Sequence, residues 1–157
     1  GCLGRIVARL AAIVTGQSED VEQTVANYAE RMSIAFQIGD DILDVEHSLD
    51  RAGDFGKAFG NDIREGKKTL MAIHAVENAD PEDAARLEEI LWADDNTDEE
   101  IEWVLELYES TGSVEYARER ALSLSDRARA TLDGLDLEPE PKTQLAEFTR
   151  FVVERDD

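Results

Sequence analysis

Residues 36–44 read FQIGDDILD, which places three aspartates, Asp40, Asp41 and Asp44, within five residues. Apolar side chains recur at intervals of three and four from residue 21 to residue 43, and this spacing predicts one long amphipathic helix. On such a helix the three aspartates and Gln37 lie close together. Asp40 and Asp44 are one turn apart, about 6 Å along the helix axis.

The aspartate cluster predicts a bound cation. Carboxylates this close repel one another, and the C-terminal end of a helix adds further negative potential. Oxygen ligands with no nearby His or Cys favour Mg²⁺ over Zn²⁺. The alternative is a solvated acidic helix end, which the flanking apolar residues Ile42, Leu43 and Val45 argue against.

Glycine-lysine pairs follow the aspartates. Residues 56–62 read GKAFGND and residues 66–70 read GKKTL, so three of the four lysines in the chain fall between Lys57 and Lys68. The spacing is not that of a Walker A loop. Glycine permits close backbone approach and lysine is a compact charge suited to phosphate. Carboxylates for Mg²⁺ beside lysines for phosphate indicate a diphosphate site.

Taken in order, these motifs resemble those of the trans-isoprenyl diphosphate synthases, the polyprenyl synthetase family. FQIGDDILD is similar to the second aspartate-rich motif of the family, and GKAFGNDIREGKKTL (residues 56–70) to the lysine-bearing segment after it. Residues 112–117 and 151–155 are similar to its C-terminal helices. The resemblance implies an all-α fold, the C-terminal part of the isoprenoid synthase helical bundle.

The resemblance also implies a metal site that uses Mg²⁺ as cofactor. Asp40 would bind Mg²⁺ directly, while Asp41 and Asp44 would hold metal-bound waters or make supporting contacts. Asp62 would hold further metal-bound waters. No other cofactor is implied.

For the substrates, the resemblance implies isopentenyl diphosphate and an allylic diphosphate, joined into a longer all-trans prenyl diphosphate. Lys57 would clamp the allylic diphosphate with Lys67 close by. Gln37 would face the allylic substrate, and Phe36 could line the hydrocarbon pocket or belong to the core. Asp40, Lys57 and Gln37 are thus the expected catalytic residues. We expect geranylgeranyl or farnesyl diphosphate as the product, although C15, C20 and C25 all stay open.

Two features of the family pattern, a first aspartate-rich motif and a Lys-Thr pair, have no counterpart here. We therefore expect residues 1–157 to form a single all-α domain, the C-terminal half of a protein that is a homodimer when complete. The 157 residues alone are expected to turn over little substrate. Asp94-Asp95-Asn96-Thr97-Asp98 also spells DDxxD, but it is interpreted as a loop in which Thr97 and Glu100 form a capping box.

Composition excludes several classes of partner. A formal net charge of −21 disfavours nucleic acid and anionic membrane surfaces, which both require a basic face. The excess of acidic residues suggests adaptation to a salt-rich cytoplasm, where charge repulsion is screened. A single cysteine fits a reducing compartment. No apolar run approaches the length of a transmembrane helix.

Further helices are predicted at residues 3–15, from Asp80-Pro81 onward, at 101–108, from Ser113 to Leu132, and after residues 139–141, where Leu145, Phe148 and Val152 form the expected buried face. Two alternatives to the enzyme stay open. One is a non-catalytic subunit of the same family that binds diphosphate or a partner chain. The other is an acidic helical interaction protein. His47 and His74 have no partner at metal-ligand spacing, and their roles are left open.

Overall fold

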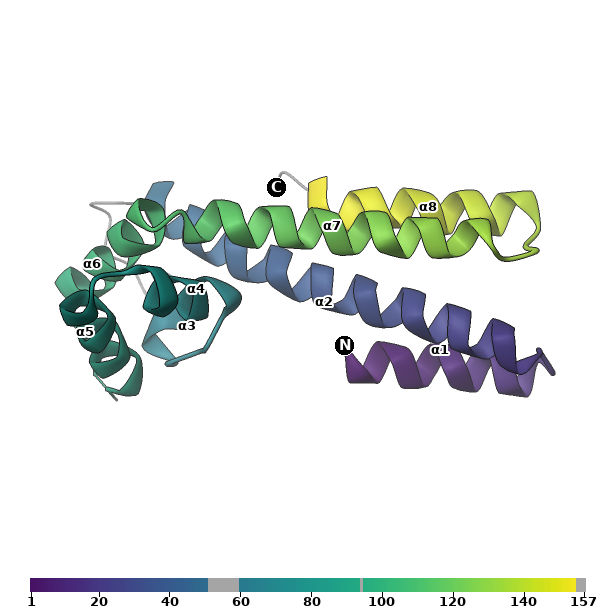
Figure 1. Cartoon of the computed structure of the whole chain (residues 1–157), viewed down its shortest axis with the longest axis horizontal. Coiled ribbons are helices and arrows are strands. Elements are labelled where there is room, and N and C mark those ends of the chain that lie inside the picture. The colour runs from purple at the N-terminus through teal and green to yellow at the C-terminus, as the bar shows by residue number, and fades with distance from the viewer. Residues whose placement is uncertain (51–59, 94, 155–157) are drawn as a thin grey trace. The chain divides into compact units, whose positions relative to one another are not determined.

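The computed structural model describes residues 1–50, 60–93 and 95–154, without the side chains of residues 50, 153 and 154. The described residues form eight helices and no strand, so the all-α prediction is confirmed (Figure 1). The helices are α1 (Cys2–Val14), α2 (Glu19–Asp50), α3 (Asn61–Arg64), α4 (Leu70–Asn78), α5 (Pro81–Trp92), α6 (Asp98–Ser110), α7 (Ser113–Asp133) and α8 (Pro139–Glu154). None of them is both long and apolar enough to cross a bilayer.

The chain divides into two units, and helix α2 belongs to both. The first unit comprises residues 1–39 and 119–157, and the second comprises residues 40–118. The boundary in α2 falls between Gly39 and Asp40, inside the FQIGDDILD stretch. Each unit is therefore described separately.

In the first unit, α8 runs beside the later turns of α7, and the core lies between them and α2 (Figure 1). The core is formed by apolar side chains of these helices, among them Tyr28, Met32, Leu132 and Val152. The Tyr28 hydroxyl donates a hydrogen bond to the Leu145 carbonyl (2.9 Å), which satisfies its polar end. Burial raises the pKa of Tyr28 to about 12.

The predicted buried face of α8 is wrong at one position. Val152 is buried and Leu145 packs against the core, but Phe148 is 46% exposed and Thr149 is buried instead. The small Thr149 allows close approach to α7, where the Ser125 hydroxyl donates to the Thr149 carbonyl at 2.6 Å. A phenyl ring would not fit at such a contact, which explains the shift of the buried face by one residue.

The second unit places α3, α4, α5 and α6 after the C-terminal turns of α2. Helix α4 packs on α5 and α6, and α3 also contacts both of these helices. Fully buried apolar residues fill the space between them, chiefly Met71, Leu87, Ile101 and Val104. The predicted helix start at Asp80-Pro81 is confirmed, with Asp80 at the N-cap position and Pro81 in the first turn.

Gly66 connects α3 to α4 through a turn that no other residue could form without strain. Its φ is +62°, in the left-handed region, and an added Cβ would lie 2.3 Å from the carbonyl oxygen of Leu91 at the end of α5. Backbone cannot move aside as a side-chain tip can. The turn that precedes α4 is therefore seated directly on α5.

Replacing Gly66 by alanine should destabilise the chain by more than the left-handed conformation alone, which costs about 1–2 kcal/mol. Gly112→Ala is the matched control, because Gly112 has φ +67° but nothing within 4 Å of the added Cβ. We expect urea denaturation to give Gly66→Ala the clearly lower free energy of unfolding. Equal losses for the two variants would contradict the contact with Leu91.

Helix α6 begins with the predicted capping box. The Thr97 side chain accepts from the Glu100 N–H at 3.2 Å, and the Glu100 carboxylate accepts from the Thr97 N–H at 2.8 Å. Replacing Thr97 by alanine would cost about 1 kcal/mol. The hydrogen bond from the Thr97 N–H lowers the pKa of Glu100 below its ordinary value of 4.5.

This lowered pKa predicts a pH-dependent contribution to stability. A carboxyl group with a lower pKa in the folded state contributes fully above pH 4.5 and loses that contribution as the pH falls through the folded-state pKa. We therefore expect wild type to be more stable than Glu100→Gln at pH 7, with the difference shrinking below about pH 4. Thermal unfolding at pH 3 to 7 measures it, and a difference that does not depend on pH would refute the ionic cap.

Candidate functional site

The aspartates of the FQIGDDILD stretch lie on the last turns of α2. Asp41 is buried among apolar neighbours, with Ile42 and Val45 beside it in the core. Asp40 and Asp44 are half-buried. The helix thus carries the predicted carboxylates in an environment that shields at least one of them from water.

Short helix α3 is held against this end of α2 by two hydrogen bonds. The Gly60 N–H donates to the buried Ser48 hydroxyl oxygen (2.9 Å), and Ser48 donates in turn to the Asp44 carbonyl (2.7 Å). The Asp62 N–H donates to the Asp44 carboxylate at 3.3 Å. These contacts bring Asp62, which is 18 residues further along the chain, beside Asp44.

Lys67 joins the two helices through its ammonium group. Its Nζ donates to Asp41 at 2.7 Å and to Asp62 at 2.8 Å. Burial alone would lower the pKa of Lys67, but the hydrogen bonds and negative charges of both aspartates outweigh it and raise the pKa. The lysine therefore stays charged, and its nitrogen marks a point where two carboxylates converge on a cation.

The surroundings of Asp44 disfavour its charged form. Burial raises the pKa of its carboxyl group, and the negative charges of Asp62 and Asp41 raise it further. The hydrogen bond from the Asp62 N–H and the positive charge of Lys67 lower this pKa, but they do not outweigh the other effects. A carboxylate whose charge is disfavoured by neighbouring carboxylates gains from additional positive charge nearby.

The second unit therefore gathers four of the eight predicted site residues, Asp41, Asp44, Asp62 and Lys67. Asp40 lies on α2 in the same unit. The other three predicted residues are placed differently: Lys57 lies outside the described residues, and Gln37 and Phe36 are exposed on the part of α2 that belongs to the first unit.

The donor set suits a hard divalent cation. Its ligands are carboxylate oxygens, and two of them already surround the Lys67 ammonium group. Mg²⁺ is commonly held by one or two carboxylates, with waters and substrate phosphates completing its ligands. Among the described side chains, no three from Asp, Glu, His and Cys are arranged to hold one metal ion by themselves. The residues thus fit Mg²⁺ bound together with a phosphate ligand.

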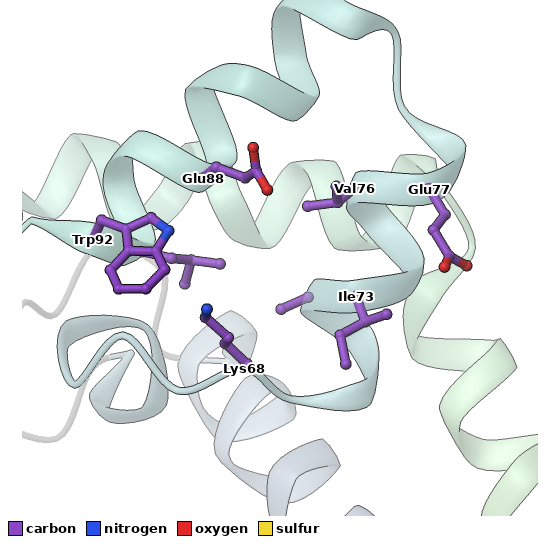
Figure 2. Close-up of a pocket in the computed structure, with 8 residues that line it drawn as sticks. Lys68, Ile73, Val76, Glu77, Glu88 and Trp92 are labelled. Atoms are coloured by element: carbon purple, nitrogen blue, oxygen red, sulfur yellow. The ribbon is translucent and has the colours of Figure 1, made fainter.

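Lys68 points away from this site. Its Nζ lies 3.9 Å from the centroid of the Trp92 ring, a cation–π contact, at one side of a pocket of about 280 Å³ between α4 and α5. Figure 2 shows Ile73 and Val76 lining this pocket and Glu88 and Glu77 nearby. The adjacent residues Lys67 and Lys68 therefore contact different groups, and no local pattern in the sequence predicted this difference.

The structure also assigns contacts to residues outside the site. His74 Nδ1 lies 2.9 Å from the Ser113 hydroxyl, and its ring stacks on Tyr116, so a packing role is sufficient for it. In the other DDxxD sequence, at residues 94–98, Asp98 forms an ion pair with Arg64. Ser48 was missed in the sequence, because a serine one turn after Asp44 carries no signal of the Gly60 N–H that it binds.

Comparison with known proteins identifies the family. The family model of polyprenyl synthetase matches residues 1–108. Geranylgeranyl pyrophosphate synthase of Geoglobus acetivorans is 36% identical over 99% of this chain and 46% of the relative. Geranylfarnesyl diphosphate synthase of Natronomonas pharaonis is 34% identical over 94% of this chain and 40% of the relative. The chain thus spans less than half the length of these relatives.

Solved structures agree with this assignment. A decaprenyl diphosphate synthase from Rhodobacter capsulatus matches 98% of this chain and 47% of its own, with a TM-score of 0.84 and 31% identity. The geranylgeranyl pyrophosphate synthase of Corynebacterium glutamicum, complexed with isoprenyl diphosphate and magnesium, matches 94% of this chain and 41% of its own, with a TM-score of 0.78 and 30% identity. The aspartates and the lysine that joins them agree with these similarities. The chain belongs to the polyprenyl synthetase family.

Proposed function

We propose that this chain is part of a Mg²⁺-dependent prenyltransferase that condenses isopentenyl diphosphate with an allylic diphosphate. The observation that carries the proposal is the convergence of Asp41 and Asp62 on the Lys67 ammonium group. A site with carboxylates for a metal and a cationic side chain for phosphate has both halves of a diphosphate-binding site. Relatives named as geranylgeranyl and geranylfarnesyl diphosphate synthases support this reaction class.

In the proposed reaction, the allylic C–O bond breaks and the diphosphate leaves with the electron pair. The alkene of isopentenyl diphosphate attacks the resulting allylic cation to form the new C–C bond, and loss of a proton restores a double bond. Mg²⁺, when bound, would supply positive charge to the leaving diphosphate. Asp40 would bind the metal directly, Asp41 and Asp44 would hold metal-bound waters or make supporting contacts, and Asp62 would hold further metal-bound waters. Catalysis rests on stabilising the leaving group and on positioning.

The substrate contacts of this proposal come from four residues. Lys57 and Lys67 hold the allylic diphosphate, because an ammonium group is a compact donor for phosphate oxygens. Gln37 and Phe36, on the turn of α2 before the aspartates, face the allylic substrate and its hydrocarbon tail. Product length is not narrowed by the relatives, whose names range from geranylgeranyl and geranylfarnesyl to octaprenyl diphosphate synthase.

Two further properties are proposed for the complete protein. The first is a homodimer, which is supported by the exposed apolar side chains of α1, including Leu3, Ile6 and Leu10. The second is function in a salt-rich cytoplasm, which is supported by the net charge of −21, since dissolved salt screens repulsion between surface carboxylates.

The test is an elongation assay at high KCl, which compares the 157-residue chain with a version extended by the upstream half of a relative. Both receive Mg²⁺, isopentenyl diphosphate and an allylic diphosphate. We expect the extended version to elongate the substrate and the 157-residue chain to show little or no turnover. Asp40→Ala in the extended version should lower the rate about 100-fold or more, since leaving-group stabilisation of this kind contributes several kcal/mol.

Asp95→Ala is the matched control. It removes one aspartate from the DDxxD sequence at residues 94–98, which lies outside the proposed site, and should leave the rate unchanged. A folded, extended chain that binds Mg²⁺ and diphosphate without elongation would support the non-catalytic subunit. The interaction-protein alternative would be favoured by the absence of any Mg²⁺-dependent diphosphate binding.

A further inference from the structure

We propose that Lys67 is an exchangeable counter-ion, which neutralises Asp41 and Asp62 when no metal is bound and is released toward the diphosphate when a divalent cation arrives. This inference rests on the proposed function, because it assumes that a divalent cation binds the aspartate cluster. It adds to that function a coupling between metal binding and diphosphate binding that runs through one side chain.

The first step of the argument is the burial of Asp41. Its side chain is only 8% exposed and accepts a hydrogen bond of 2.7 Å from the Lys67 ammonium group. A buried carboxylate without a paired cation is strongly destabilising, because neither water nor protein compensates for the lost solvation. Asp41 therefore needs a cation beside it, and in this structure Lys67 is that cation.

The second step is that Lys67 cannot neutralise the two carboxylates and bind a diphosphate strongly at the same time. Its ammonium group has three donors, and Asp41 and Asp62 occupy two of them at 2.7 and 2.8 Å. A lysine held in this way offers little positive charge to a diphosphate, since two carboxylates already surround it. Binding the diphosphate strongly requires that another cation replace Lys67 between the carboxylates.

The third step is that the Lys67 side chain can move while the backbone on either side of it stays in place. Gly66 is seated on the Leu91 carbonyl, and the buried Thr69 caps α4 by accepting from the Ala72 N–H at 3.2 Å. Between these anchors, the Lys67 side chain is 37% exposed. It can therefore leave the carboxylates by rotation about its own side-chain bonds, without unfolding the turn.

These steps predict reciprocal coupling. A divalent cation at the aspartates releases Lys67 for the diphosphate, and a diphosphate that attracts Lys67 vacates the carboxylates for the cation. By linkage, each ligand then raises the affinity for the other by the same factor. The price of this coupling is weaker binding of the metal alone, because a metal without diphosphate must first displace the lysine.

The test measures binding of Mn²⁺ alone, as a paramagnetic substitute for Mg²⁺, to the 157-residue chain in 1 M KCl. The loss of the free Mn²⁺ electron paramagnetic resonance signal reports binding, and no diphosphate is present. Lys67→Met should bind Mn²⁺ more tightly than wild type by about tenfold or more, the usual size of the effect of one adjacent charge. Lys68→Met is the matched control, because it removes an equal charge that lies over the Trp92 ring. Its affinity for Mn²⁺ should stay within about twofold of that of wild type.

Equal affinity of wild type and Lys67→Met, or weaker binding by Lys67→Met, would overturn the exchange. So would the absence of Mn²⁺ binding by both chains. If Lys67→Met fails to fold by circular dichroism, nuclear magnetic resonance of wild type decides. The Lys67 ammonium signal should lose its hydrogen-bonded character when Mg²⁺ is added, and persistence of that signal at saturating Mg²⁺ would refute the exchange.

These outcomes are separable from those of the elongation assay. Equal Mn²⁺ affinities combined with normal elongation by the extended chain would overturn only the role of Lys67. Tighter Mn²⁺ binding by Lys67→Met without any elongation would support the exchange and overturn the prenyltransferase.

Discussion

Asp41 carries a carboxylate with almost no access to water, and the arrangement of the second unit depends on supplying that carboxylate with a cation. Lys67 provides it, and by contacting Asp62 with the same ammonium group it also ties α3 to α2. The hydrogen bonds from Gly60 to Ser48 and from Asp62 to Asp44 work in the same direction. A charged site that would otherwise repel itself thus becomes a contact between two helices.

The position of Lys67 depends in turn on parts of the unit that carry no charge. Gly66 rests on the end of α5 with no room for a side chain, and Thr69 caps α4 by accepting from the Ala72 N–H. Lys68 is drawn to the opposite side by Trp92. Two neighbouring lysines with the same chemistry therefore have different partners, because the turn between α3 and α4 is fixed on α5 and directs successive side chains to different sides.

Carboxylates and a lysine stabilise one another in this unit. Without Lys67, the negative charges of Asp41 and Asp62 would disfavour each other. With the Lys67 ammonium group between them, both carboxylates are held close to Asp44. The chain spans less than half the length of the relatives it matches.

Much of the fold and of the site could be predicted from local sequence patterns. The long helix predicted over residues 21–43, which the structure extends to Glu19–Asp50, was predictable from its spacing. The helix start at Asp80-Pro81 and the Thr97–Glu100 capping box were also predictable, because spacing and capping act over one or two turns. The order of the aspartate and lysine motifs was likewise sufficient to indicate the family. The buried face of α8 was not predictable, since Phe148 and Thr149 are both compatible with helical spacing.

Tertiary structure alone decided which charged groups meet. The resemblance to the family indicated Lys67, but no local pattern shows that Lys67 would meet Asp41 or that the Ser48 hydroxyl would accept from the Gly60 N–H, because these contacts join residues that are 12 to 26 positions apart. The sequence by itself determined the helices and the chemistry available to the site. The packing of α3 and of the Gly66 turn decided that Asp41 and Asp62 would share one ammonium group, because a charge in a buried position must find its partner wherever the fold brings one within reach.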